Sequence, residues 1–194
     1  MTAPAVVLAS GSATRAAMLT AAGVPHRVVP AAVDEEQIKQ SMRAEGASSD
    51  DVAALLAEFK ASRVSARTAA ALVIGADQML DCEGRWFDKP PDRDHARAQL
   101  QALRGRSHRL VTAACVALNG SVIWRQTETA TLIMRRFSDT FLDAYVRDRT
   151  EDLCASVGAY RIEAKGIQLF SRIEGSHFAI LGLPLLALLD FLRQ

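Results

Sequence analysis

Cysteine is scarce in this chain, and so are the features that mark secreted or membrane-bound proteins. The 194 residues include 3 cysteines, Cys82, Cys115 and Cys154, which lie far apart and form no CxxC or Cys/His pattern. Neither a disulfide framework nor a zinc site is therefore expected. The first residues lack the basic segment and the apolar length of a signal peptide, and no stretch reaches the roughly 20 uncharged apolar residues of a membrane span. These absences predict a cytoplasmic protein with no membrane partner.

An excess of charge of either sign is also missing. Lysine and arginine number 23 and aspartate and glutamate 22, which leaves a formal net charge of +1. No overall field attracts nucleic acid, so nucleic acid is not an expected partner, and any bound anion must be held by a local site. A hydrophobic fraction of 49% is ordinary for a globular protein. The length predicts a single domain over residues 1–194, with room for two lobes.

Helices and strands alternate along the sequence. Asn119-Gly120, between two long apolar runs, is the strongest hairpin signal because this pair suits a type I′ turn. Residues 30–36 are expected to form a loop, and a buried strand is expected to end at Asp77. The expected strands cover residues 5–9, 26–29, 72–76, 108–118, 121–134 and 167–173, and the expected helices 14–22, 48–68, 92–103, 138–149 and 183–192. This alternation predicts an α/β protein with a mixed sheet.

A small-residue segment, Ser10-Gly11-Ser12-Ala13-Thr14-Arg15, lies between the first expected strand and helix. Such a loop exposes backbone N–H groups at a helix N-terminus, which favours an anion such as phosphate. Ser10 and Ser12 can add hydroxyl donors, and the planar guanidinium of Arg15 suits phosphate oxygens. The alternative, at about even odds from spacing alone, is a serine-rich N-cap followed by a solvated arginine.

Acidic side chains form two candidate positions for a divalent metal. Asp77 follows an apolar strand, and ligands bind at the carboxyl ends of strands in α/β sheets. Asp34, Glu35 and Glu36 form a second acidic patch. Because Mg²⁺ is typically held by one or two carboxylates plus substrate phosphates, Asp77 and Glu35 suffice. The alternatives are a turn-forming aspartate and, above all for Glu36, a solvated charge run.

Two lysines stand in settings where they could bind phosphates. Lys60 lies within an apolar, alanine-rich helix, and Lys89 lies in a loop just before a helix. Each alone is more often a surface charge. Together with Arg15 they can form a positive wall opposite the acidic pair.

Short motifs spread over residues 5–186 resemble one family. They are Leu8-Ala9-Ser10-Gly11-Ser12-Ala13-Thr14-Arg15-Ala16-Ala17-Met18-Leu19, Val33-Asp34-Glu35, residues 57–61, Gly75-Ala76-Asp77-Gln78, Lys89-Pro90, Gly158-Ala159-Tyr160 and Gly182-Leu183-Pro184-Leu185. In this order and spacing the chain is similar to the Maf-type nucleotide pyrophosphatases. The resemblance implies a mixed, elongated sheet with flanking helices, like that of inosine triphosphate pyrophosphatases, and two lobes around a cleft.

The resemblance also implies an activity and its residues. A nucleoside triphosphate is hydrolysed to a monophosphate and pyrophosphate with a divalent cation, Mg²⁺ or Mn²⁺, and a homodimer is a conceivable assembly. The family's catalytic positions fall on Asp77, Glu35, Lys60 and Lys89, with Asp77 as proton acceptor and with Asp77 and Glu35 as metal ligands. Its substrate-binding positions fall on Ser10, Ser12, Thr14, Arg15, Gln78 and Glu163.

Three of these positions distinguish subgroups of the family. Gln78 and Glu163 resemble the group that acts on 7-methyl-GTP, whereas the dTTP/UTP group has threonine and glutamine there. Thr14 departs from both groups, and Arg161 and Lys165 replace residues that are usually uncharged. The resemblance therefore leans towards a purine or methylated purine, with Gln78 and Glu163 reading the base.

Two other function classes compete with an enzyme. Proteins of this family have been associated with inhibition of septum formation, so a nucleotide-binding regulator without turnover is one alternative. A complete acidic and basic set argues against it, since a pure binder has no need of one. A nucleic-acid-binding protein is the other, and the absence of a basic stripe argues against that.

Overall fold

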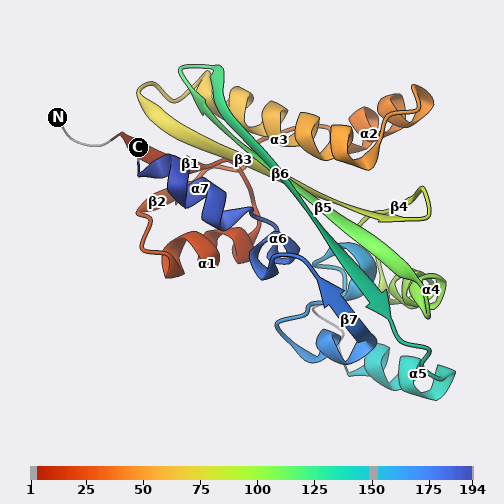
Figure 1. The fold of residues 1–194 in the computed structure, drawn as a ribbon. Helices are drawn as coiled ribbons and strands as arrows, with labels where there is room; N and C mark the ends of the chain where they lie inside the picture. Colours follow the sequence, from red (N-terminus) through yellow and green to blue (C-terminus); the bar gives the residue numbers. More distant parts are fainter. Residues whose placement is uncertain (1–3, 149–152, 194) are drawn as a thin grey trace. The chain divides into compact units, whose positions relative to one another are not determined.

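The computed structural model describes residues 4–148 and 153–193, and Figure 1 shows its fold. The strands are β1 (Ala5–Leu8), β2 (His26–Val28), β3 (Ala71–Cys82), β4 (Arg85–Phe87), β5 (Ser107–Leu118), β6 (Ser121–Met134) and β7 (Phe170–Glu174). The helices are α1 (Ala13–Ala21), α2 (Glu35–Ala44), α3 (Ser49–Ser65), α4 (Arg93–Leu103), α5 (Asp139–Arg147), α6 (His177–Leu181) and α7 (Leu185–Leu192), with short 3₁₀ turns at Val157–Ala159 and Lys165–Leu169. The predicted mixed α/β class is confirmed.

The chain forms two compact units. The first contains residues 1–78, 111–129 and 176–194, and the second contains residues 79–110 and 130–175. Three long strands, β3, β5 and β6, contribute residues to both, and the strand order is β2-β1-β3-β5-β6-β7, with β4 paired to β3. The single domain over residues 1–194 therefore remains a prediction. Two units that share three strands are also compatible with one domain that has two lobes.

In the first unit, helices cover both faces of the parallel strands. Strand β1 pairs in parallel with β2 and with β3, in a register that sets Val7 beside Val73. Helices α1 and α7 lie on one face and α3 lies on the other (Figure 1). Leu8 and Ile74 pack with α1 and α7, whereas Val7 and Val73 pack with Val64 of α3. The period of two along each strand therefore assigns odd and even positions of β3 to different helices.

This alternation continues into the predicted site. Gly75 and Asp77 share the face of Val73, which carries α3, and Asp77 contacts Lys60 of that helix. Ala76 and Gln78 share the opposite face, where Gln78 contacts the carbonyl groups of α6. Neighbouring residues of one strand thus point into two different environments.

The second unit is built on two antiparallel pairings. Strands β3 and β4 form a hairpin that pairs Leu80 with Phe87, and β6 pairs with β7. Helix α4 begins after Asp92, whose side chain caps the helix. An aromatic cluster of His108, Tyr160 and Phe170 has ring centroids 4.8 to 5.9 Å apart. These contacts give this unit its own core.

Most predicted elements are confirmed, including the Asn119-Gly120 turn, where both residues have positive φ as a type I′ turn requires. Two predictions are wrong. The loop at residues 30–36 ends in helix α2, capped by Asp34. Strand β3 does not end at Asp77 but continues to Cys82. The closing helix predicted over residues 183–192 is confirmed as α7, and Gly182, in a left-handed conformation, separates it from the short helix α6, which was not predicted. No described helix is long and apolar enough to cross a membrane.

Candidate functional site

The approach of α3 to β3 is the local basis of the site. A Cβ atom at Gly75 would lie 2.1 Å from the carbonyl oxygen of Ala57 and 2.8 Å from the Cβ of Ala61. Glycine on the strand and alanine on the helix therefore allow contact between backbones that larger residues would prevent. This contact carries Lys60, on the same helix, to Asp77, two residues further along the strand.

Lys60 joins two carboxylates. Its ammonium nitrogen lies 2.6 Å from Asp77 Oδ1 and 2.7 Å from Glu35 Oε1. Lys60 and Asp77 are buried, whereas the side chain of Glu35 is 42% exposed. A buried ion pair is favourable only when its geometry is good, because desolvation of both charges opposes it. The structure thus brings together three of the four residues predicted to be catalytic.

The second carboxylate oxygen of Asp77 has no hydrogen-bond partner. Asp77 Oδ2 is buried and unpaired among the described residues. Buried carboxylate oxygens are seldom left without a donor or a cation, because their desolvation is costly. No group of three or more histidine, cysteine, aspartate or glutamate side chains able to hold a metal occurs in residues 4–148 and 153–193. Asp77 and Glu35 are therefore a two-carboxylate set, which fits a hard divalent cation that takes its other ligands from water and phosphate.

The serines of the predicted loop organise the start of α1. Ser12 caps the helix, accepting from the Arg15 N–H at 3.3 Å, and Ser10 Oγ accepts from the Ser12 N–H at 3.2 Å. The N–H groups of Ala13 and Thr14 lie in the first helical turn, where a helix offers them no internal partner. Both serines use their oxygens as acceptors, so their hydroxyl hydrogens can still donate to an anion.

Arg15 is buried instead of solvated. Its guanidinium donates to Gly182 O at 2.8 Å, to Ala76 O at 2.9 Å and to Ser10 Oγ at 3.1 Å. Burial lowers the pKa of Arg15 from its ordinary value, and the charges of Asp77 and Glu35 partly offset this. Arg15 therefore ties the serine loop to β3 and to the residue that ends α6, and it adds positive potential beside the carboxylates.

Gln78 is held by three oxygen atoms. Its side-chain nitrogen donates to Thr112 Oγ1 at 2.8 Å and to the carbonyl oxygens of Ala179 and Ile180, each at 3.0 Å. The Thr112 hydroxyl in turn donates to Ala179 O at 2.8 Å. The backbone N–H of Gly182 also donates to Ala179 O, at 2.9 Å, so these side chains add to the cap at the end of α6.

The remaining predicted residues are placed separately. Thr14 is half-buried in the first turn of α1. Lys89 is exposed in the second unit, in the loop after β4. Glu163 also lies in the second unit, where Arg161 Nε donates to its Oε1 at 2.8 Å. The substrate-binding roles of these residues and of Ser10, Ser12, Arg15 and Gln78 stay predictions.

Sequence reasoning missed several residues that build the site. Gly75 and Gly182 lie within the family motifs, but those motifs alone do not reveal their structural roles. The Ala57 and Ala61 spacing, four residues apart on one helical face, was a signal for close packing against a glycine. Thr112 lies in an apolar strand, and no sequence pattern marks its hydroxyl as a partner of Gln78.

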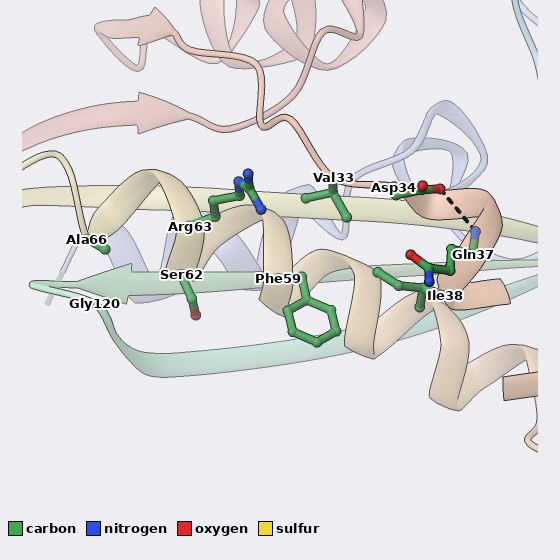
Figure 2. A pocket seen from close by; sticks show the side chains of 9 residues that line it. All are labelled: Val33, Asp34, Gln37, Ile38, Phe59, Ser62, Arg63, Ala66 and Gly120. Atoms are coloured by element: carbon green, nitrogen blue, oxygen red, sulfur yellow. Dashed lines mark hydrogen bonds between the residues drawn. The ribbon is translucent and has the colours of Figure 1, made fainter. Parts of the chain in front are cut away.

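A surface pocket of about 510 Å³ lies beside α2 and α3. Figure 2 shows side chains from the start of α2, among them Ile38, facing Phe59 and Arg63 of α3. Its lining residues are Val33, Asp34, Gln37, Ile38, Phe59, Ser62, Arg63, Ala66 and Gly120. Glu35 and Lys60 are not among them, so this pocket is distinct from the carboxylate pair.

One family model matches almost the whole chain. Residues 5–194 match the family model described as Maf-like protein. With almost the whole chain covered, this protein belongs to the Maf family.

Relatives match over nearly their full lengths. A nucleoside triphosphate pyrophosphatase of Granulibacter bethesdensis is 55% identical over 189 residues, covering 97% of this chain and 96% of the relative. One of Paramagnetospirillum magneticum is 57% identical over 188 residues, covering 97% of each. A 7-methyl-GTP pyrophosphatase of Rhizobium meliloti is 44% identical over 191 residues, covering 98% and 96%.

Among solved structures, a nucleoside triphosphatase (dITP/XTP pyrophosphatase) from Mycobacterium abscessus matches with a TM-score of 0.40 and 18% identity. It covers 68% of this chain and 74% of that one. Values this low carry no conclusion about this chain.

Proposed function

We propose that this protein hydrolyses a nucleoside triphosphate between its α and β phosphates, releasing a monophosphate and pyrophosphate. The observation that carries the proposal is Lys60 bridging Glu35 and Asp77, with Asp77 Oδ2 left unpaired. Relatives 55% and 57% identical over 97% of the chain are named nucleoside triphosphate pyrophosphatases, which supports the same activity.

A divalent cation, Mg²⁺ or Mn²⁺, fits the two carboxylates. Asp77 Oδ2 and Glu35 would hold it, and the unpaired buried oxygen is what supports this assignment. When bound, such a cation neutralises charge on the phosphate oxygens as the phosphoanhydride breaks.

The chain's own residues have separable roles in this scheme. The first turn of α1, with Ser10 and Ser12, donates hydrogen bonds to phosphate oxygens. Asp77 accepts a proton from the attacking water, and Lys60 keeps the Asp77 carboxylate oriented through Oδ1. The phosphate-binding role of Lys89 rests on the family motif alone. Positioning and fixed charge supply most of the rate enhancement in phosphoryl chemistry of this kind.

The favoured substrate is a purine triphosphate, with 7-methyl-GTP as a candidate. Gln78 and Glu163 support this choice as residues that read the base, and a relative 44% identical is named for that nucleotide. A cytoplasmic location and a homodimer complete the proposal.

A pyrophosphate-release screen tests the activity. Wild type with Mg²⁺ or Mn²⁺ is offered the standard nucleoside triphosphates and 7-methyl-GTP, and pyrophosphate is measured with a coupling enzyme. Turnover of one or a few nucleotides is expected. Nucleotide binding without release of pyrophosphate across the whole panel contradicts the proposal and favours the regulator of septum formation.

Asp77→Asn tests the proton acceptor. This variant should lose turnover by at least about a hundredfold while it still binds nucleotide. Asp34→Asn is the matched control, because it makes the same change at the exposed N-cap of α2, where asparagine caps equally well. Retained turnover in Asp77→Asn removes Asp77 from the chemistry.

A further inference from the structure

The side-chain amide of Gln78 has only one orientation that suits its surroundings. Two of its three partners are the backbone carbonyl oxygens of Ala179 and Ile180, and a carbonyl oxygen can only accept. The atom that faces them must therefore be the amide nitrogen. In the flipped orientation, the amide oxygen would lie 3.0 Å from each of these two carbonyl oxygens, with no hydrogen between them.

Thr112 fixes this orientation from the other side. Its side chain is buried, with no exposed surface, and its hydroxyl donates to Ala179 O at 2.8 Å. Because that single hydrogen is used, Thr112 Oγ1 can only accept from Gln78, at 2.8 Å. Both hydrogens of the Gln78 amide are thus engaged, one by Thr112 and the other by the two carbonyl oxygens of α6.

We propose that Thr112 is a positioning residue that makes Gln78 present only its amide oxygen to the nucleotide. Gln78 directly follows Asp77 in β3, although the two side chains point to opposite faces of the sheet. No hydrogen bond to Gln78 Oε1 occurs within the part of the chain that the structure describes. An oxygen held in this way selects a base whose facing edge carries an N–H group. The inference rests on the proposed function, in which Gln78 reads the base.

This acceptor favours the lactam edge of a guanine-type base over adenine. Guanine carries an N–H at its ring nitrogen and an adjacent amino group, and methylation at N7 leaves that edge intact. Adenine carries a lone pair at the same ring nitrogen, which faces an acceptor unfavourably, so adenine can donate to this oxygen only through its 6-amino group, whereas guanine offers two adjacent N–H donors. A glutamine free to rotate could serve either base, so the selectivity depends on the constraint by Thr112. Loss of one such hydrogen bond in a buried site is worth roughly tenfold in discrimination.

Kinetics with three variants test the proposal. Thr112→Val removes the hydroxyl at nearly equal volume, Thr112→Ser restores it, and Thr131→Val makes the same threonine-to-valine change on β6. We expect the ratio of kcat/KM for GTP to that for ATP to fall about tenfold in Thr112→Val and to recover in Thr112→Ser. Thr131→Val should keep the wild-type ratio. A wild-type preference for ATP, or an unchanged ratio in Thr112→Val, overturns the proposal.

The Gln78 amide itself gives a readout that does not depend on turnover. In ¹⁵N NMR spectra, its two side-chain protons are assigned by their absence in Gln78→Met. We expect slow exchange of both protons with solvent in wild type and at least tenfold faster exchange in Thr112→Val. Equal exchange in the two proteins overturns the positioning role even if the enzyme is active. If the wild type is inactive but the Gln78 amide exchanges faster in Thr112→Val, the proposed activity is refuted and the orientation of Gln78 is still supported.

Discussion

Gly75→Ala should damage activity more than it damages stability. The added Cβ would meet Ala57 O at 2.1 Å, the Ala61 nitrogen at 2.6 Å and the Ala61 Cβ at 2.8 Å. These atoms belong to the backbone of α3 or sit directly on it, so no side-chain rotation relieves the contact. Since non-bonded carbon contacts are optimal at about 3.5–4.0 Å, α3 must move away from β3 by roughly 1 Å.

The displacement acts directly on the ion pair. Lys60 Nζ lies 2.6 Å from Asp77 Oδ1, and both belong to the elements that are forced apart. Overpacking of a core position costs about 1–3 kcal/mol of unfolding free energy. A misplacement of about 1 Å in a catalytic group can cost about a hundredfold in rate. We therefore expect kcat/KM to fall by about two orders of magnitude in a protein that is still folded.

Urea unfolding and steady-state kinetics of the same preparations measure both effects. Gly46→Ala is the control, because its positive φ of 73° strains any side chain while open space surrounds it. That variant should lose about 1 kcal/mol of stability and no activity. If Gly75→Ala keeps the kcat/KM of the wild type, the close approach of α3 does not set the catalytic geometry.

Three further predictions follow from buried or paired charges. Burial lowers the pKa of His108 from 6.5 to about 4, so the folded state disfavours the proton that the unfolded state binds. Above pH 6.5 the unfolding free energy includes the full contribution of neutral His108, and it falls by about 3 kcal/mol as the pH drops from 6.5 to 4. Urea unfolding measures this loss, which His108→Gln should not show. Lys60→Met should destabilise the fold by about 2–3 kcal/mol, because it leaves the buried Asp77 carboxylate without its ion-pair partner. Asp77→Asn in the same chain should recover part of that loss in a double-mutant cycle. Arg161→Ala should lower the melting temperature only slightly, because the Arg161 and Glu163 side chains are 33% and 29% exposed and water partly screens the pair. The variant should alter the order of KM values among nucleotides, and an unchanged order argues against Glu163 as a reader of the base.

The sequence predicts elements well where one local signal dominates. The Asn119-Gly120 turn and the start of α4 near Asp92 depend on residues close together in sequence, and both are confirmed. Helix α2 was missed because three consecutive acids resemble a solvated loop, although Asp34 caps the helix and its first turn favours negative charge. The end of β3 was misplaced because an aspartate after an apolar run resembles a turn.

The site was predictable in its residue types but not in its contacts. Lys60, Glu35 and Asp77 were selected as phosphate and metal residues, and the structure joins them in one cluster. Tertiary packing determines that Lys60 pairs with Asp77 Oδ1 and leaves Oδ2 without a partner. Arg15 was expected to face a polyanion, yet it donates to carbonyl groups of residues 61 and 167 positions away in sequence, which no local pattern reveals.

The alternation of β3 has a consequence for how such a protein can change over time. Asp77 and Gln78 are joined by one peptide bond, but their side chains point to opposite faces of the sheet, where Asp77 bonds Lys60 and Gln78 bonds Thr112. A substitution at position 78 is therefore felt by α6 and Thr112, while α3 and the ion pair behind Asp77 are undisturbed. Substitutions on the Gln78 face of β3 can therefore change nucleotide preference during evolution, while the catalytic residues on the Asp77 face stay the same.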